Sequence, residues 1–522
     1  MTAKAELNER RVRLGRLSTN RSDCSGPWIL TVAILGSSMA FIDGTVINVA
    51  LPALQAAFRS TGSTLQWIIE AYSLSLASLL LLGGSFGDLY GRKRTFMVGV
   101  VIFAASSAIC GMATDPSIVI IGRAVQGIGG ALLVPGSLAL ISAFFSEETR
   151  GQAIGIWSGA TAVAACVGPL LGGWLIQNAS WRAIFFLNIP IALTVLIACI
   201  WKVPESRNPH ATRPDWIGAA LAAAGLGLFT FALIEGGDHP LRYWPVGLVG
   251  ALLICGFVIW EWYSDHPMMP LDVFRSTSFS IANIVTLLIY AALSGALYYL
   301  PLHLIQIQHY TATQAGSVLL PLTILIAVLS RWTGGLVKRV GAKFPLVIGS
   351  ILTSGGYALL LLLEPEGTYR GTVLPGVILL GLGLAIIVAP LTTTIMNSVG
   401  REHSGTASGI NNAISSVASL LAISVCGAIF SAAFAGHLQI GLSNSSLPDA
   451  MRRQIFVHRG ELGGMIVSSP DARKIVDQAF VASLHLILML SCALSILSAI
   501  VCVFLKGRTL SSEQAPDGNI HR

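Results

Sequence analysis

Apolar segments of about twenty residues recur along almost the whole chain, and short polar turns separate them. Each segment is long enough to cross a ~30 Å hydrocarbon core as a helix. The pattern predicts fourteen membrane-spanning helices and leaves no room for a soluble domain. The spans are expected to begin near Trp28, Trp67, Thr95, Ser117, Gly151, Ala183, Asp215, Pro245, Phe279, Thr313, Phe344, Gly371, Thr406 and Phe480.

A basic turn bounded by glycines follows the second span, and a similar turn follows the tenth. They read GSFGDLYGRKR at residues 84–94 and GGLVKRVGAK at residues 334–343. The repeated turn predicts two related six-helix halves. Many secondary transporters have this arrangement, and their substrate site lies between the halves. The residues that align are Gly84 with Gly334, Gly91 with Gly341, and Lys93 with Lys343.

The predicted fold is an all-α polytopic membrane protein made of two six-helix bundles and two extra central helices. One long polar loop, residues 435–479, interrupts the second bundle, and its patches of helical periodicity suit either a lid or a surface for a partner. The predicted parts are a basic tail (1–27), the N-terminal bundle (28–201), the extra helices (215–263), the C-terminal bundle (279–505) and a second tail (506–522).

Composition supports the membrane class, because only 11% of the residues are charged and 54% are hydrophobic. The net charge of +7 is unevenly distributed: most of the 32 Lys and Arg residues fall on the side of the N-terminal tail. This bias predicts a multi-pass protein of the cytoplasmic (inner) membrane with both termini in the cytoplasm. The basic tail is therefore interpreted as a topogenic signal rather than a nucleic-acid or lipid site. The first apolar run is too long for a cleaved signal peptide.

Three charged residues lie well inside apolar segments: Asp43, Glu70 and Arg123. A charge in the bilayer is costly and usually functional. Burial raises the pKa of a carboxylate and a nearby guanidinium lowers it, so a carboxylate between these influences can exchange protons near neutral pH. Arg123 stays charged and can act as its partner. The three are expected to share one cavity. The alternatives are a static ion pair for Asp43 with Arg123, and a carboxylate facing lipid headgroups for Glu70.

Several residues of the turn GDLYGRKR have predicted structural roles. Gly91 permits a tight backbone turn, Asp88 can accept hydrogen bonds from the start of the next helix, and Arg92 and Lys93 face the cytoplasm. By itself the turn could also be a simple basic loop.

The stretch GPLLGGWL places Pro169 inside the fifth span, among Gly168, Gly172 and Gly173. Proline removes a backbone hydrogen bond and glycines allow close helix contact, so a kinked, tightly packed helix is expected. Static helix packing is the alternative.

Other chemistry is weakly indicated. The eight cysteines have no paired spacing, and no Walker or HExxH motif occurs, which argues against an ATP-driven pump or a metal site. No GxSxG nucleophile elbow is indicated either, because the one match in letters, GGSFG at residues 83–87, ends an apolar helical span rather than a strand; this argues against a hydrolase. No cofactor is expected. His303 is interpreted as a hydrogen-bonded core histidine, and the carboxylates at helix ends as solvated anchors. These carboxylates are Glu235, Glu261 and Glu364.

These motifs together resemble the major facilitator superfamily, and specifically its fourteen-helix drug:proton antiporters, over about residues 28–505. The turn departs from the usual loop signature at Phe86 and Leu89. The SWRAIFFLNIP stretch at residues 180–190 is also typical of the group. The other matching positions are Asp43, Thr45, Asn48 and Pro52 in the first span, Gly84, Asp88, Gly91, Arg92 and Lys93 in the turn, Arg123, Gln126, Gly127 and Gly129 in the fourth span, and the GPLLGG motif.

The resemblance implies proton-coupled efflux of hydrophobic or cationic drugs by alternating access, not an enzyme. It implies proton coupling through Asp43, Glu70 and Arg123, and an antiporter role for Gly168, Pro169, Gly172 and Gly173. In similar proteins, the residues matching Asp88 and Arg92 lock the turn to the other half. Gating would thus depend on Gly84, Asp88, Gly91, Arg92 and Lys93. The substrate cavity is expected to include Asn48, Gln126, Asn411 and Asn412.

The acid in WIIEAYSL stands where some exporters of organic cations carry one. By contrast, Asn411 and Asn412 occur where some exporters of dications have a carboxylate, which disfavours divalent cations. The expected partners are a small-molecule substrate, protons and the lipid bilayer, without nucleic acid. A periplasmic adaptor is expected in a Gram-negative host, and a monomer otherwise.

The main alternative function is a dedicated exporter of one endogenous metabolite, lipid or peptide on the same scaffold. A proton-coupled importer is disfavoured by GPLLGG. A membrane transferase would need a polar catalytic cluster, which the sequence does not provide.

Overall fold

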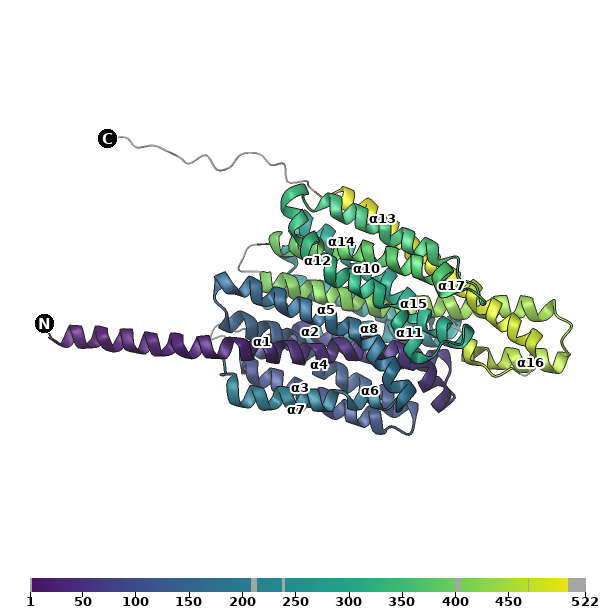
Figure 1. Ribbon diagram of the computed structural model, residues 1–522, viewed down its shortest axis with the longest axis horizontal. Coiled ribbons are helices and arrows are strands. Elements are labelled where there is room, and N and C mark those ends of the chain that lie inside the picture. The colour runs from purple at the N-terminus through teal and green to yellow at the C-terminus, as the bar shows by residue number, and fades with distance from the viewer. Residues whose placement is uncertain (1, 208–213, 237–239, 400–403, 468, 506–522) are drawn as a thin grey trace.

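The computed structural model describes residues 2–207, 214–236, 240–399, 404–467 and 469–505. The chain forms an elongated bundle of helices (Figure 1). Within the described ranges, 14 helices are long and apolar enough to cross a membrane, and they match the predicted spans. The prediction of an all-α polytopic fold is confirmed. The tail at residues 506–522 lies outside the described residues.

The N-terminal half contains six spans, of which the sixth is broken at Leu187. Its helices are α1 (Thr2–Phe58), α2 (Gly62–Tyr90), α3 (Arg92–Met112), α4 (Pro116–Phe144), α5 (Glu147–Asn178), α6 (Ala183–Phe186) and α7 (Asn188–Lys202).

Two additional helices, α8 (Trp216–Glu235) and α9 (Pro240–Tyr263), pack against each other. They lie in the middle of the sequence but at the periphery of the bundle. Helix α9 is the outer of the two, because most of its surface is not covered by the protein. Helix α8 packs against α2 and α15, so it lies along one seam between the halves. Trp67 Nε1 of α2 donates a hydrogen bond to Glu235 Oε1 of α8 across 2.9 Å.

The C-terminal half begins with a short 3₁₀ turn and contains two π-helical segments. Its elements are η1 (Leu271–Arg275), α10 (Thr277–Leu302), η2 (His303–Ile307), α11 (Ala312–Val318), α12 (Leu320–Val340), α13 (Lys343–Leu360), η3 (Tyr369–Val373), α14 (Leu374–Asn397), α15 (Ser404–Ser443), α16 (Asp449–Val457), η5 (His458–Gly464) and α17 (Pro470–Val503).

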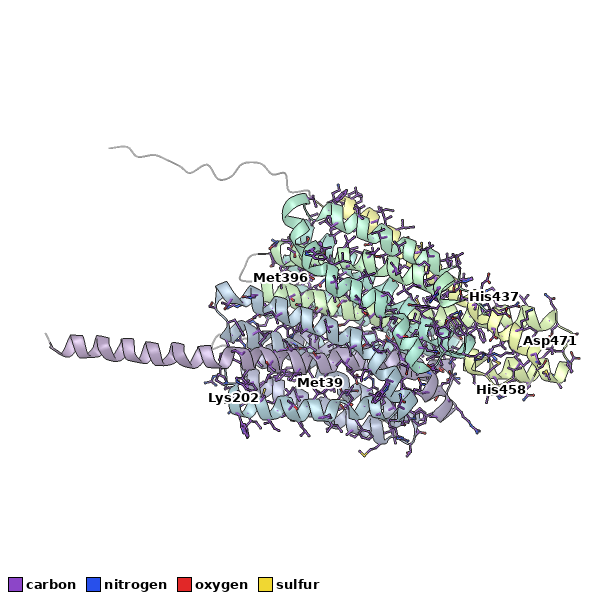
Figure 2. All side chains as sticks on the ribbon, in the orientation of Figure 1. Met39, Lys202, Met396, His437, His458 and Asp471 are labelled. Carbon is purple, nitrogen blue, oxygen red and sulfur yellow. The ribbon has the colours of Figure 1, made fainter. Side chains whose placement is uncertain are left out.

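The two ends of the bundle are distinct. Helix α1 begins at Thr2 and projects from one end, which is called the termini side here; the opposite end is the distal side (Figure 1). Lys202 and Met396 lie toward the termini side, whereas His437, His458 and Asp471 lie on the distal side (Figure 2).

The predicted internal repeat has a backbone counterpart. Among the described residues, the glycines with positive φ are Gly91, at 111°, and Gly341, at 77°. These two glycines align in the repeated turns. Only glycine adopts such angles readily, because a Cβ atom would strain the backbone there. Each glycine thus ends one helix just before the next, α3 or α13, begins.

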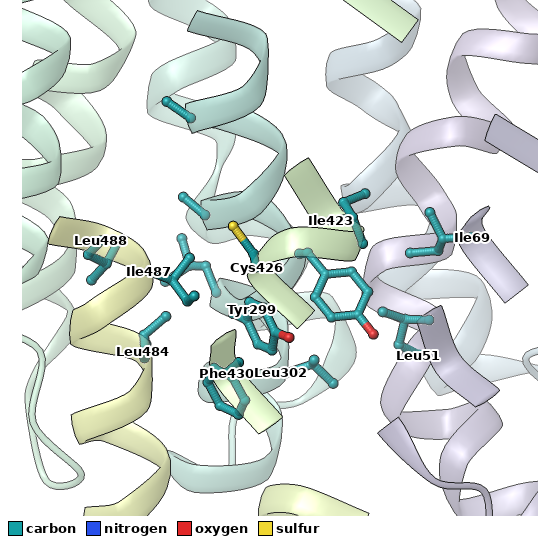
Figure 3. Packing of buried hydrophobic residues seen from close by; sticks show 14 of the residues in the cluster. Leu51, Ile69, Tyr299, Leu302, Ile423, Cys426, Phe430, Leu484, Ile487 and Leu488 are labelled. Atoms are coloured by element: carbon teal, nitrogen blue, oxygen red, sulfur yellow. The ribbon is translucent and has the colours of Figure 1, made fainter. Parts of the chain in front are cut away.

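The two halves meet through a shared apolar core. Figure 3 shows Tyr299, Cys426 and Phe430 at its centre, with Leu51 and Ile69 of the N-terminal half on one side. The helices of the two halves diverge toward the termini side and come together on the distal side (Figure 1).

The predicted long loop at residues 435–479 is mostly helical. Helix α15 continues to Ser443, α17 already starts at Pro470, and α16 and η5 lie between them. These residues form a projection on the distal side, the distal hairpin (Figure 1). The helical patches expected here are present, but the polar composition did not indicate how far α15 and α17 extend into the segment.

The distal hairpin contacts both halves. Gln55 Nε2 of α1 donates to the carbonyl oxygen of Glu461 across 2.7 Å, and Gln306 Nε2 of η2 donates to Gln55 Oε1 across 2.6 Å. Arg473 of α17 donates to the carbonyl oxygen of Gln306. The hairpin is therefore linked by hydrogen bonds to both halves on the distal side.

Candidate functional site

The structure brings Asp43 of α1 and Arg123 of α4 together. Arg123 Nη1 donates to Asp43 Oδ2 in an ion pair, and both side chains are only 1% exposed. The contact lies inside the N-terminal half, near the middle of the first span. Two buried charges of opposite sign compensate each other only when further hydrogen bonds complete their coordination.

Neutral polar groups complete the environment of Asp43. Gln126 Nε2 donates to Asp43 Oδ1 across 2.9 Å, and Asn188 Nδ2 donates to the same oxygen across 3.1 Å. Asn188 Nδ2 also donates to Ser107 Oγ across 3.0 Å. Asp43 therefore receives donors from α4 and α7. Gln126, which was expected near the substrate cavity, is thus a member of this buried cluster.

Asn188 and Ser107 were not singled out from the sequence. Asn188 lies in the SWRAIFFLNIP stretch, where it is a lone amide within an apolar run. An amide in such a run needs a buried hydrogen-bond partner, and this was the available signal.

Arg123 is held by α2 as well. Its Nε donates to the carbonyl oxygen of Ile68 across 3.2 Å, and its Nη1 donates to Gln126 Oε1 across 2.8 Å. The guanidinium carbon lies 4.3 Å from the centre of the Tyr72 ring, a cation–π arrangement. Ile68 and Tyr72 are one helical turn apart, so they define the face of α2 that contacts Arg123.

Glu70 lies on the other face of α2. It is two residues from both Ile68 and Tyr72, and a helix turns about 100° per residue, so its side chain points away from Arg123. It faces Ser424 of α15, in the C-terminal half. The expectation that all three charges share one cavity does not hold in this structure, because the phase of α2 separates Glu70 from the ion pair.

Glu70 is completely buried, at 0% exposure. In the described part of the chain, neither of its carboxylate oxygens has a hydrogen-bond partner. The Ser424 hydroxyl lies beside it but donates to the carbonyl oxygen of Leu420 across 3.0 Å. The alternative of a carboxylate facing lipid headgroups is therefore wrong, and the residue faces the interface between the halves.

The other residues expected in the substrate cavity have different environments. Asn411 Nδ2 donates to Asn283 Oδ1 across 3.1 Å and to Thr286 Oγ1 across 2.7 Å, which joins α15 to α10 within the C-terminal half. Asn48 and Asn412 are both half-buried.

The GDLYGRKR turn is fastened to its own half. Asp88 accepts from Arg92 Nε across 2.9 Å, within the turn. Glu205, just after α7, accepts from the backbone N–H groups of Lys93 and Arg94 across 3.0 and 3.2 Å. Asp88 thus accepts from Arg92, the first residue of α3, as expected, while Glu205 accepts from the backbone N–H groups that follow it. In this conformation Asp88 and Arg92 pair with each other instead of reaching the other half.

Sequence reasoning missed Glu205, which is 112 positions from Lys93. Gly91 is essential to its approach, because a Cβ atom there would lie 2.8 Å from the Glu205 carboxylate. Gly84 is less constrained, with its nearest neighbour, Pro135, 4.0 Å from an added Cβ.

The GPLLGG motif lies between two neighbours of α5. A Cβ added at Gly168 or Gly172 would collide with Thr45 or Val46 of α1. On another face, a Cβ at Gly173 would collide with the backbone of Ala312, at the start of α11. The predicted close packing around Pro169 is present, and it extends to the other half of the molecule.

Pro169 itself contacts the other half, since a Cβ added at Gly316 of α11 would collide with its carbonyl oxygen. The motif therefore lies on the distal seam between the halves.

Two other expectations need correction. Glu261 is 2% exposed and accepts from the backbone N–H of Met269 across 2.9 Å, so it is a buried anchor for the following segment. Glu235 accepts from Trp67, while Glu364 is exposed as expected. His303 is buried and stacks on Phe480, but its ring nitrogens have no hydrogen-bond partner among the described residues.

Two cavities lie near the seam on the distal side. A cavity of about 720 Å³ lies between the end of α1 and the distal hairpin, with Gln55, Arg59 and His458 in its wall. A smaller one, of about 130 Å³, lies among α2, α8, α10 and α15.

Two repeated bundles of spans, a buried ion pair and a glycine-rich seam together define a secondary transporter. The chain matches the family model described as Major Facilitator Superfamily over residues 33–423. It belongs to this superfamily of membrane transporters, and the predicted resemblance is confirmed.

Several relatives match almost the whole chain. The multidrug resistance protein Stp of Mycobacterium tuberculosis (strain CDC 1551 / Oshkosh) is 32% identical over 492 residues, covering 91% of this chain and 90% of Stp. The tetracenomycin C resistance and export protein of Streptomyces glaucescens is 29% identical over 508 residues, covering 94% of each chain.

The fold is also that of solved transporters. A bacterial homologue of the human lysosomal transporter Spinster, in an inward-facing and occupied conformation, has a TM-score of 0.60 to this chain at 16% identity. The match covers 91% of this chain and 97% of that structure. At this identity the likeness concerns the fold alone.

Proposed function

We propose that this chain is a proton-coupled antiporter that exports hydrophobic or cationic drugs across the cytoplasmic membrane by alternating access. The observation that carries the proposal is the ion pair of Asp43 and Arg123, buried in an apolar interior. A titratable carboxylate at such a place is a hallmark of proton-linked transport. The relatives named for multidrug resistance and for tetracenomycin C export support drug export as the direction.

In the proposed mechanism, Asp43 is the proton carrier. When a proton binds one of its carboxylate oxygens, the residue loses its charge and its attraction for Arg123. Arg123 keeps its charge, and its remaining partners are Gln126, the Ile68 carbonyl group and the Tyr72 ring. Protonation would therefore loosen the link between α1 and α4, while α2 retains Arg123. Glu70 is proposed as a second acidic group of the transport path.

Gating is proposed at both ends of the seam. On the distal side, the GPLLGG motif (Gly168, Pro169, Gly172 and Gly173) supports closure of the halves against α11. On the termini side, Asp88 and Arg92 would exchange their mutual pair for contacts with the other half when that side closes, with Gly84, Gly91 and Lys93 shaping the turn. The substrate path is proposed to pass Asn48 and Asn412, which are half-buried.

The termini side is proposed to face the cytoplasm, in accordance with the bias of basic residues. The GDLYGRKR turn then lies inside and the distal hairpin outside. The protein is proposed to act as a monomer, or with a periplasmic adaptor if its host has an outer membrane. The distal hairpin is the surface that would meet such an adaptor.

A second candidate is a dedicated exporter of one endogenous metabolite. The relative from Streptomyces glaucescens favours it, because its name specifies a single compound, tetracenomycin C. A susceptibility screen in a pump-deficient host separates the two: protection against several unrelated compounds supports a multidrug pump, and protection against one supports a dedicated exporter.

The central test uses Asp43→Asn in proteoliposomes. The substitution keeps the size of the side chain and removes its titratable group. Transport driven by an imposed pH gradient should disappear, while insertion and elution from a sizing column remain normal. The exposed Glu364→Gln is the matched control for loss of a carboxylate. Gradient-driven transport by Asp43→Asn at the wild-type rate would exclude Asp43 as the proton carrier.

A further inference from the structure

Among the described residues, every side chain that hydrogen-bonds to Asp43 is a donor. Arg123 Nη1 donates to its Oδ2, and Gln126 Nε2 and Asn188 Nδ2 donate to its Oδ1. All three contacts favour the ionised carboxylate. A protonated carboxyl group carries an O–H group that needs an acceptor instead, and leaving it buried without one is costly. A residue that takes up and releases a proton therefore needs a neighbour that suits both of its forms.

Asn188 provides an unused acceptor beside Asp43. The residue is 1% exposed, and its Oδ1 has no hydrogen-bond partner among the described residues. Its Nδ2 makes two bonds, to Asp43 Oδ1 across 3.1 Å and to Ser107 Oγ across 3.0 Å. The ionised form of Asp43 requires this orientation, because a carboxylate attracts an N–H group and repels an amide oxygen. The Asn188 amide is thus satisfied on its nitrogen side only.

Gln126 also presents an amide to Asp43, but its orientation is fixed. Its Oε1 accepts from Arg123 Nη1 across 2.8 Å, while its Nε2 donates to Asp43 Oδ1 across 2.9 Å. A half-turn of this amide would place its N–H groups against the guanidinium, which has no acceptor. Gln126 therefore remains a donor to Asp43 in either protonation state, whereas no partner holds the oxygen of Asn188 in place among the described residues.

The surroundings of Asn188 allow its amide to turn. A half-turn exchanges Nδ2 and Oδ1 with almost no change of shape. Ser107 adapts to either orientation, because a hydroxyl can accept from Nδ2 or donate to Oδ1 as its hydrogen rotates. In the present orientation Ser107 Oγ donates to the carbonyl oxygen of Phe185 across 2.7 Å. Phe185 lies in α6 and Asn188 begins α7, so the amide lies at the break in the sixth span.

The other titratable groups near Asp43 keep their ordinary charge. Tyr72 of α2 and Cys110 of α3 interact electrostatically with Asp43, as does Arg123 of α4. A phenol, a thiol and a guanidinium ordinarily hold their protons at neutral pH. The contribution of α7 is the neutral amide of Asn188, which responds to a proton on Asp43 by changing its hydrogen bonds.

We propose that Asn188 is a positioning residue for proton coupling, whose amide turns when Asp43 is protonated. The proton binds Asp43 Oδ1, because Arg123 occupies Oδ2, and the new O–H group donates to Asn188 Oδ1. Release of the proton reverses the turn, and Asn188 Nδ2 donates to the carboxylate again. The proton stays on Asp43 while Asn188 exchanges only hydrogen bonds. The inference rests on the proposed role of Asp43 as proton carrier and adds a residue that stabilises both of its forms.

The test is infrared difference spectroscopy of the purified full-length protein in D₂O, between acidic and neutral conditions. Asp43→Asn identifies the O–D stretching band of protonated Asp43, because the band disappears in this variant. In the wild type the band should lie at the lower wavenumber of an O–D group that donates a hydrogen bond. Asn188→Leu keeps the approximate size of the side chain and removes its donor and acceptor, so the band should shift to a higher wavenumber.

Gln126→Leu is the matched control, because it also removes an amide that donates to Asp43. Its O–D band should stay at the wild-type position, since Gln126 accepts nothing from Asp43 in either state. Asn188→Leu should in addition slow gradient-driven transport about tenfold, because Asp43 loses a hydrogen bond in each protonation state. Asn188→Thr supplies a hydroxyl that can donate or accept, and should recover part of both the rate and the band position.

An unchanged band in Asn188→Leu would overturn the proposal. A wild-type band at the position of a free O–D group would overturn it as well, and this measurement serves if Asn188→Leu does not fold. If a band of Asp43 is present but ignores Asn188→Leu, Asp43 remains the proton carrier and only the role of Asn188 fails. If Asp43→Asn removes no band, Asp43 takes up no proton, and the proposed function fails together with the turn of Asn188.

Discussion

The guanidinium of Arg123 and the carboxylate of Asp43 form an ion pair from which solvent is almost entirely excluded. Arg123 adds contacts with Gln126 and the Ile68 carbonyl group, so one side chain joins α1, α2 and α4. Removing one member of a buried pair leaves the other charge uncompensated, at a cost of about 3–5 kcal/mol. This arrangement makes the two partners unequal, because Asp43 can be neutralised by a proton and Arg123 cannot.

Arg123→Ala should therefore abolish transport and lower the thermal stability of the protein in detergent. Arg123→Lys should keep a positive charge and recover part of the stability and transport, but not all of it, since an ammonium cannot reproduce the planar fork. Both can be measured by proteoliposome transport and by thermal unfolding. Wild-type transport by Arg123→Ala would limit the pair to a structural role.

The combination Asp43→Asn with Arg123→Gln provides an informative control. It removes both charges, so no buried charge remains without a partner. Its thermal stability should exceed that of Arg123→Ala, whereas its gradient-driven transport should stay absent. Restored transport in the double variant would show that the pair stabilises the bundle but does not carry protons.

Gly173 should be indispensable because it brings α5 against the backbone of α11 in the other half. Gly173→Ala should force the halves apart on the distal side and reduce transport strongly. A cysteine introduced at the distal seam should be labelled faster in this variant. Gly155→Ala on the same helix is the control, because a Cβ there meets nothing within 4 Å. Equal effects of the two variants would argue against a specific role for the seam.

The number and order of the spans, the family and the repeat could be predicted from the sequence, because a membrane helix is encoded locally by twenty apolar residues. The pairing of Gly91 with Gly341 also has a local cause, the need for positive φ. The motifs identified Asp43 and Arg123. Their contact follows from the packing of α1 against α4, which the residues of either span do not specify alone.

The features that the sequence did not predict depend on tertiary packing or on the direction in which a side chain leaves its helix. Asn188 and Glu205 act on residues more than one hundred positions away, so no local pattern marks them. Glu70 was expected to share a cavity with the ion pair because all three charges lie inside apolar spans, but a position within a span does not specify the direction in which its side chain points. The polarity of the distal hairpin obscured how far α15 and α17 extend into it, although helical patches were expected there.

Gly91 should tolerate substitution less well than Gly341. Both need positive φ, which costs an alanine roughly 1–2 kcal/mol, but only Gly91 is also approached by the Glu205 carboxylate. Gly91→Ala should therefore lower thermal stability more than Gly341→Ala. Glu205→Gln should produce part of the Gly91→Ala effect, as the N–H groups of Lys93 and Arg94 lose a charged acceptor. Equal losses at Gly91 and Gly341 would show that backbone strain alone matters.

Gln55 should stabilise closure on the distal side, since it bonds both Glu461 of the distal hairpin and Gln306 of η2. Gln55→Ala should open this side and increase labelling of a cysteine placed at Ala56, which borders the larger distal cavity. Each lost neutral hydrogen bond contributes about 0.5–1.5 kcal/mol. Two such bonds can shift a conformational equilibrium about tenfold. Unchanged labelling would mean that the hairpin rests on the bundle without holding it closed.

Asp88 offers a test of conformational gating that is separate from stability. In this structure it pairs with Arg92 one turn away, and both side chains are partly exposed. Such a pair contributes only about 0.3–0.5 kcal/mol, so Asp88→Asn should leave thermal stability nearly unchanged. The proposed role of Asp88 belongs to the other conformation, in which the termini side is closed and charge-assisted hydrogen bonds of about 1.5–3 kcal/mol each reach the other half.

Asp88→Asn should therefore favour the conformation that is open on the termini side by about one to two decades. Turnover should fall strongly, equilibrium substrate binding should stay within a few-fold, and a cysteine near the termini side of α2 should be labelled faster. Asp272→Asn is the matched control, because Asp272 also pairs locally with an arginine, Arg275, but at 81% exposure. Normal turnover and labelling in Asp88→Asn would show that the turn has no gating role and acts only as a topogenic loop. A loss of turnover together with a large loss of thermal stability would instead indicate a structural defect.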